Sequence, residues 1–212
     1  MDSLVAAVIH DAKNALNTLN VRLDQARQLA PSPPLEQATA IVANLSTRLV
    51  ELLAFYRADQ GTLRMAVEDQ NLTDFIDDLQ QELAAEPDLP ITLEWDIAGA
   101  QAIGAWAFDA YLVKVALLDA LRNALRHARH RVSLSVTAEP GGGIRLSVAD
   151  DGPGYPAEIL AGESNLAMAK GSSGLGLRFA ALIAERHCTP QGRRGRLALA
   201  NNQGAIFSLI LP

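Results

Sequence analysis

The apolar residues of the first 60 positions recur at alternating spacings of three and four, the pattern of a helix with one narrow apolar stripe. The pattern occurs twice, and Pro31-Ser32-Pro33-Pro34 separates the two copies. Proline interrupts a helix interior, so this stretch marks a turn. The sequence therefore predicts a helical hairpin over residues 1–60. The stripes consist of Ile9, Ala12, Leu16, Leu19, Leu23 and Ala26, then Leu35, Ala38, Val42, Leu45, Leu49, Leu52 and Tyr56.

Two helices with one stripe each cannot enclose a core alone. Pairing with a second copy would cover both stripes in a four-helix bundle, so a homodimer is expected. The alternative is a hairpin folded back on the C-terminal part of its own chain.

Residues 61–212 mix helical and strand patterns, which indicates a second domain of the α+β class. Helices are expected over residues 72–85 and 109–128, and antiparallel strand pairs on either side of Gly141-Gly142-Gly143 and of Asn201-Asn202-Gln203-Gly204. Ile91, Leu93, Trp95 and Ile97 alternate as in a further strand.

The net charge of −6 and the pI near 5.2 argue against a nucleic-acid partner, which would require a broad basic face. Arg193, Arg194 and Arg196 cluster among glycines, as expected of a solvated turn. Cys188 is the only cysteine, which excludes an internal disulfide and favours a reducing compartment.

Uninterrupted apolar runs are short, and the N-terminus lacks the pattern of a secretory signal. We therefore expect no membrane span, and we expect a cytoplasmic location.

One face of the predicted helix 109–128 carries Asp119, Asn123 and Arg126 or His127, opposite an apolar stripe. A solvated helix face would give the same pattern. Two glycine-containing segments follow. Asp150-Asp151-Gly152-Pro153-Gly154 comes directly after a strand, as a plain Asp-Gly turn also would.

The second segment, Gly174-Leu175-Gly176, opens a helix that extends to about His187. Glycines at a helix N-terminus offer backbone N–H groups to phosphates, although one such cluster is weak evidence alone. The three signals, in this order and spacing, resemble the N, G1 and G2 boxes of the histidine kinase ATP-binding domain. That family shares its nucleotide fold with gyrase B, Hsp90 and MutL. The resemblance covers about residues 62–212 and implies an α/β sandwich that binds ATP and Mg²⁺.

Carried over to this sequence, the resemblance implies that Asn123 coordinates Mg²⁺ and that Arg126 faces the phosphates, with His127 at the border of the site. Asp119 stands where the family usually has a second Asn, and would act as a carboxylate ligand or add negative charge. Asp150 would accept a hydrogen bond from the adenine amino group.

The same resemblance assigns the glycines. Gly152 and Gly154 would shape the turn under the nucleotide, and Gly174, Leu175 and Gly176 would close around its phosphates. Residues 155–173 would form a short lid that lacks the usual phenylalanine.

His10-Asp11-Ala12-Lys13-Asn14 resembles the phosphoacceptor H box of the same family. A histidine on a helix flank is usually an ordinary surface residue, but the linked nucleotide motifs favour an acceptor role. Asp11 could orient the ring and take its proton, and Asn14 lies one turn away on the same face.

The resemblance implies an ATP-dependent protein-histidine kinase that autophosphorylates His10 and passes the phosphoryl group to an aspartate of a response regulator receiver domain. Few residues precede His10, so a separate sensor protein is the expected source of input. Two alternatives remain. One is a histidine phosphotransfer protein whose nucleotide domain no longer turns over ATP; the other is an ATP-driven conformational machine or serine kinase of the same superfamily.

Overall fold

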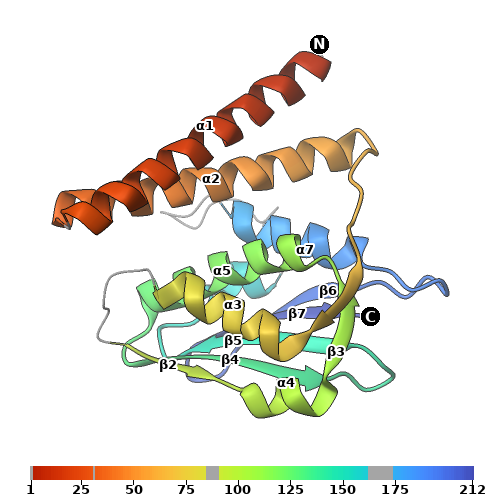
Figure 1. Ribbon diagram of the computed structural model, residues 1–212. Coiled ribbons are helices and arrows are strands. Elements are labelled where there is room, and N and C mark those ends of the chain that lie inside the picture. Colours follow the sequence, from red (N-terminus) through yellow and green to blue (C-terminus); the bar gives the residue numbers. More distant parts are fainter. Residues whose placement is uncertain (1, 31, 85–90, 162–173) are drawn as a thin grey trace. The chain divides into compact units, whose positions relative to one another are not determined.

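The computed structural model describes residues 2–30, 32–84, 91–161 and 174–212, with the side chains of residues 2–10 and 13 outside that description. The chain divides into two compact units, Met1–Leu63 and Arg64–Pro212 (Figure 1). Each unit is described by itself.

The first unit is a helical hairpin made of α1 (Asp2–Leu29) and α2 (Pro33–Asp59). Pro33 and Pro34 occupy the first turn of α2, where a missing N–H costs nothing. The chain leaves α2 through Gln60, and Gly61 follows with φ 66°. The N-terminal helices predicted from the apolar spacing are confirmed.

The helix α2 bears on the expectation that the chain has no membrane span. Although its uninterrupted apolar runs are short, it is long and apolar enough as a whole to cross a bilayer, with an 18-residue window of mean hydropathy 1.4. Length and composition alone are weak evidence of a span, because core helices of globular proteins meet the same criteria. Arg48 and Glu51 lie within α2 and form an ion pair at 3.1 Å.

The second unit is built on a five-stranded sheet of order β2-β4-β5-β7-β6. Its strands are β2 (Thr92–Trp95), β4 (Arg131–Ala138), β5 (Ile144–Asp150), β6 (Arg196–Asn201) and β7 (Ala205–Leu211). The pairs β4–β5 and β6–β7 are antiparallel, as the sequence predicts. The pair β5–β7 is also antiparallel, whereas β2 pairs parallel with β4. The sheet is therefore mixed.

Helices α3 (Leu72–Ala84), α5 (Ala110–His127) and α7 (Leu175–Arg186) cover one face of this sheet (Figure 1). The core between these two layers is formed by the inward residues of the strands and the apolar stripes of the helices. Its fully buried members include Leu117, Leu121, Leu134, Leu146, Phe179, Ile183 and Leu209. The α+β class and the α/β sandwich are confirmed.

Two details differ from the sequence prediction. Ile97 begins the short helix α4 (Ile97–Ile103) instead of extending a strand, because the Asp96 carboxylate accepts a hydrogen bond from Gly99 N at 2.9 Å and starts the helix. Strands β1 (Glu68–Asn71) and β3 (Ala105–Phe108) form a separate antiparallel pair. The polar segment Glu68–Asn71 has no apolar alternation that would predict it.

Candidate functional site

The polar face of α5 is held in place from the start of the helix. The Asp109 carboxylate accepts hydrogen bonds from Leu112 N at 3.0 Å and from Ala66 N at 2.9 Å. The N–H group of Asp109 donates to Nε2 of His187 at 2.9 Å. These bonds link the first turn of α5 to the C-terminal end of α7, although the two segments are far apart in the sequence.

His187 is a structural residue that sequence reasoning missed. Its side chain is buried, and Nδ1 lies 2.8 Å from the carbonyl oxygen of Ile183. Burial lowers the pKa of the His187 ring below its ordinary value. Because Nε2 accepts a hydrogen bond from Asp109 N, the ring is neutral and carries its hydrogen on Nδ1.

Asp119 and Asn123 lie one turn apart on the half-exposed face of α5, whereas Leu117, Leu121 and Ala124 are buried. Arg126 and His127 occupy the last turn and are exposed. The structure therefore places the four predicted residues of this helix along one continuous stretch of α5.

Asp150 is the last residue of β5, and backbone groups orient its carboxylate. Oδ1 accepts hydrogen bonds from Gly152 N at 2.8 Å and from Ala205 N at 3.2 Å. Oδ2 makes no hydrogen bond to the described residues. The side chain thus has one oxygen fixed and one oxygen available to a ligand that carries an N–H group, such as an amino-substituted ring.

The turn after Asp150 approaches its neighbours so closely that it needs glycine. A Cβ at Gly152 would lie 2.4 Å from the carbonyl oxygen of His127, at the end of α5. A Cβ at Gly204 would lie 1.9 Å from the carbonyl oxygen of Asp150. Any side chain would push these segments apart, so the glycines bring Asp150 next to the end of α5.

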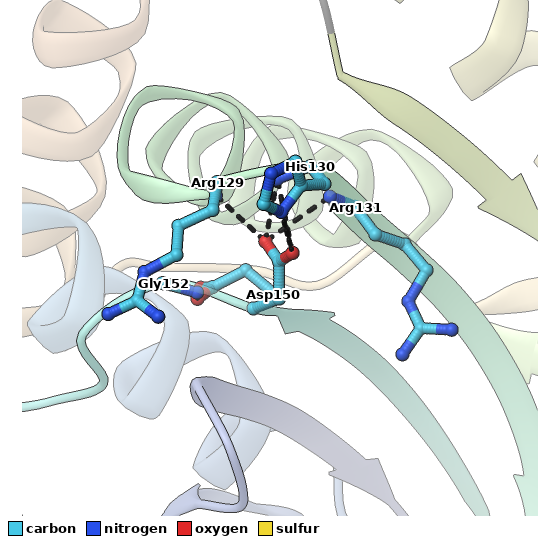
Figure 2. A network of polar contacts seen from close by, with 6 residues as sticks. Arg129, His130, Arg131, Asp150 and Gly152 are labelled. Carbon is cyan, nitrogen blue, oxygen red and sulfur yellow. Dashed lines mark hydrogen bonds and ion pairs between the residues drawn. The ribbon is translucent and has the colours of Figure 1, made fainter.

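Asp151 holds the loop between α5 and β4. Its Oδ1 accepts hydrogen bonds from the backbone N–H groups of Arg129, His130 and Arg131 at 2.8, 3.0 and 3.2 Å (Figure 2). Hydrogen bonds to the carboxylate, above all the one from the His130 backbone N–H, keep the pKa of Asp151 well below its usual range. Sequence reasoning gave Asp151 no role, and the only signal was the doubled aspartate before Gly152.

Tyr155 also belongs to this region, although the sequence analysis treated it only as the first residue of a lid. Burial raises the pKa of its phenol, and the negative charges of Asp150 and Asp119 raise it further. Asp119 from α5 and Asp150 from β5 are thus the two charged residues whose electrostatic effect reaches the residue after Gly154.

The first turn of α7 supplies the third part of the predicted site. Gly174 precedes the helix in a left-handed conformation with φ 61°, and Leu175 and Gly176 are its first residues. All three are half-buried. The first N–H groups of a helix have no partners within the helix, so this end can bind an anion. Residues 162–173, most of the predicted lid, lie outside the described residues.

The oxygen donors on α5 suit Mg²⁺. Among the described residues no group of three or more His, Cys, Asp or Glu could hold a metal ion by itself. Mg²⁺ in nucleotide sites is commonly bound by one or two protein oxygens together with phosphates and water. The Asp119 carboxylate and the Asn123 carboxamide, one turn apart on the same face, fit that requirement.

The predicted acceptor site lies in the first unit. His10 falls within α1, but its side chain is outside the described residues. Asp11 and Asn14 are exposed on the same helix, and the Asn14 carbonyl accepts a hydrogen bond from the Thr18 hydroxyl at 3.0 Å.

The layers of helices and sheet, together with the glycine-containing turn after Asp150, indicate that the second unit is an ATPase domain. Residues 109–212 match the family described as histidine kinase-, DNA gyrase B-, and HSP90-like ATPases. Sensor protein KdpD of Rathayibacter rathayi is 28% identical to this chain over 142 residues, which are 65% of this chain. The match spans only 16% of the length of that relative.

Solved structures of histidine kinases share the fold. Full-length ShkA in complex with AMPPNP has a TM-score of 0.67 at 17% identity, over 100% of this chain and 46% of ShkA. Histidine kinase AdeS of Acinetobacter baumannii has a TM-score of 0.60 at 16% identity, over 93% of this chain and 95% of AdeS. The catalytic domain of histidine kinase ThkA gives 0.53 at 19% identity, over 70% of this chain and 98% of that domain. Residues 109–212 thus match this ATPase family, and the chain shares its fold with histidine kinases.

Proposed function

We propose that this chain is an ATP-dependent kinase that phosphorylates its own His10 and transfers the phosphoryl group to an aspartate of a response regulator receiver domain. The observation that carries the proposal is the Asp150 carboxylate, which has Oδ1 fixed by two backbone N–H groups and Oδ2 open. It lies within an ATPase domain, and a helical hairpin that bears a candidate acceptor histidine precedes that domain.

In this proposal the second unit binds ATP. Oδ2 of Asp150 accepts a hydrogen bond from the adenine amino group, and the first turn of α7, with Gly174 and Gly176, binds the phosphates. Asn123 and Asp119 would hold Mg²⁺, which neutralises the charge of the phosphates. Arg126, in the last turn of α5, would face the phosphates and add a positive charge there.

The first unit then supplies the acceptor. A ring nitrogen of His10 attacks the γ-phosphorus, the bond from that phosphorus to the β,γ-bridging oxygen breaks, and ADP leaves. Asp11 takes the proton from the other ring nitrogen, and Asn14 lies beside the acceptor on the same helix. A carboxylate of the receiver domain afterwards attacks the phosphorus, the N–P bond breaks, and His10 regains its proton.

The hairpin also supports a homodimer. Three leucines of the predicted apolar stripes remain exposed, with relative accessibilities of 42% for Leu19, 51% for Leu45 and 50% for Leu52. A second hairpin would cover them in a four-helix bundle. The Arg48–Glu51 ion pair within α2 would be costly inside a bilayer, so we favour this packing role over a membrane span. We also propose a cytoplasmic location, because the Arg48–Glu51 pair disfavours α2 as a membrane span.

The proposal is tested by incubating the purified chain with γ-labelled ATP and Mg²⁺, without another kinase. Wild-type protein should acquire acid-labile label, and His10→Gln should not. His130→Gln is the matched control, because that histidine belongs to the second unit, its backbone bond to Asp151 is kept, and the glutamine amide can replace the 3.2 Å contact of its ring with Asp151 Oδ2. Label in the His10→Gln variant would refute the assigned acceptor. Label that appears only when another kinase is added would favour the phosphotransfer protein instead.

A further inference from the structure

Arginines gather at the end of the five-stranded sheet that lies opposite Asp150. Arg145 and Arg196 lie near the starts of β5 and β6, and Arg193 and Arg194 lie in the loop between α7 and β6. This loop and the β4–β5 hairpin project from the same end of the sheet (Figure 1). We call these four residues the arginine cluster.

The loop of the cluster is fastened to the β4–β5 hairpin. Arg193 Nη1 donates hydrogen bonds to the carbonyl oxygens of Gly141 and Gly142, the latter at 2.6 Å. Within the loop, Thr189 N donates to Arg193 O at 2.9 Å, and Arg193 N donates to Thr189 Oγ1 at 3.2 Å. The backbone that carries Arg193 and Arg194 is therefore held in place before any partner binds, which lowers the entropic cost of binding.

Glu139 shows how a carboxylate binds to this cluster. Its Oε1 lies 2.6 Å from Arg145 Nε, and its Oε2 lies 3.6 Å from Arg196 Nη2. One carboxylate thus serves two guanidinium groups, and the Arg196 side chain is still 57% exposed. Arg194 is exposed and makes no ion pair with the described residues. The cluster keeps an excess of positive charge, although the formal net charge of the chain is −6.

The cluster borders a region of the sheet with short side chains. Arg145 and Arg196 are both register partners of Ile210, so their side chains lie on the same face. Leu146 and Leu209 point to the other face, where they are buried under the helices. The next row of register partners on the arginine face is Ser135, Ser147, Ser208 and Ala198. These short side chains allow a partner to come close to the sheet beside the arginines.

We propose that the arginine cluster and the adjoining sheet face bind an acidic segment of a partner protein, whose Asp or Glu side chains pair with Arg194 and Arg196. The planar guanidinium group matches a carboxylate with two parallel hydrogen bonds. The net charge of −6 disfavours a nucleic acid or an anionic membrane, because such extended surfaces would meet the negative charge of the whole chain. A short segment meets mainly the charges within about 10 Å of it.

This inference goes beyond the proposed kinase activity and does not rest on it. Asp150 follows Arg145 by five positions in β5, which corresponds to about 17 Å along the strand. The two surfaces therefore occupy opposite ends of the sheet.

The test is the binding of a fluorescent decaglutamate peptide to the full chain, measured by anisotropy at low ionic strength. Arg194→Gln and Arg196→Gln each remove one exposed ion pair, so each should raise the dissociation constant about two- to fivefold. The double variant should bind about 4- to 25-fold more weakly. Arg131→Gln is the matched control, because Arg131 is exposed at the opposite end of the sheet and loses the same charge. It should leave the constant unchanged.

Amide NMR spectra of the chain with the peptide show where the peptide binds. The signals of Gly141, Gly142 and Gly192 should shift, because these glycines lie beside the arginines. Shifts confined to Gly152 and Gly174, or displacement of the peptide by ADP with Mg²⁺, would place it in the candidate nucleotide site and overturn the proposal.

The remaining outcomes also decide the proposal. It is overturned if the wild-type chain does not bind the peptide, or if the double variant binds as tightly as wild type. Binding to phosphatidylserine vesicles that exceeds binding to the peptide, and that the double variant loses, would assign the cluster to a membrane surface instead. Melting temperatures report on folding, and Arg194→Gln remains decisive if Arg196→Gln is unstable. A chain that binds the peptide but acquires no label from ATP would refute only the proposed kinase activity.

Discussion

Replacing Asp150 by asparagine separates its structural role from its proposed ligand role. Oδ1 accepts two backbone hydrogen bonds, from Gly152 N at 2.8 Å and Ala205 N at 3.2 Å, and the carboxamide oxygen of asparagine can accept both. The open Oδ2 becomes an NH₂ group. An adenine amino group would then meet a donor where it needs an acceptor.

The expected loss of affinity follows from that exchange. A hydrogen bond to a charged group contributes about 1.5–3 kcal/mol, so the ADP dissociation constant should rise about 10- to 150-fold. The fold should be largely retained, because both backbone bonds keep an acceptor.

Asp150→Ala is the informative companion variant. It removes both backbone bonds to a charged group as well as the ligand acceptor, and two such losses should lower the free energy of unfolding by about 3–6 kcal/mol. Calorimetry with ADP and thermal unfolding of both variants check the argument. Wild-type ADP affinity in Asp150→Asn would show that Oδ2 does not face the nucleotide. Equal stability of Asp150→Ala and wild type would show that the backbone bonds contribute nothing.

Three further predictions concern the surroundings of the site. Asp151→Ala should lower the melting temperature and weaken ADP binding, because the loop after α5 loses the acceptor of three backbone N–H groups, whereas unchanged values for both would contradict this role. Gly204→Ala would place a Cβ 1.9 Å from Asp150 O, so it should lower the unfolding free energy by about 1–3 kcal/mol and also weaken ADP binding. Gly192→Ala, at a glycine with φ 83° and open space around it, is its control and should leave ADP binding unchanged. His187 has its pKa lowered in the folded state, so the unfolded chain takes up a proton there that the folded chain does not, and stability should fall as the pH drops below about 6.5. Urea unfolding from pH 7.5 to 5 should show a shallower decline in His187→Gln, and parallel curves for the two proteins would exclude this coupling.

Local patterns in the sequence determined much of this protein. The apolar spacing predicted α1 and α2 because a helix repeats its faces within a few residues. Short-range alternation and glycine turns predicted the strand pairs β4–β5 and β6–β7 for the same reason. The positions of Asp150 and of Gly174 relative to their strand and helix were also readable from neighbouring residues.

Tertiary structure decided how those parts meet. The bonds that orient Asp150 and Tyr155 join residues 55 and 46 positions apart, and no local pattern encodes them. The link from His187 to Asp109 spans 78 positions, so a buried ring at the end of α7 looked like an ordinary helix-terminal histidine. The parallel pairing of β2 with β4 likewise depends on the path of the chain between these two strands, which no local pattern encodes. A side chain's neighbours in space set its charge state and hydrogen bonds, and in a folded chain most of those neighbours are distant in sequence.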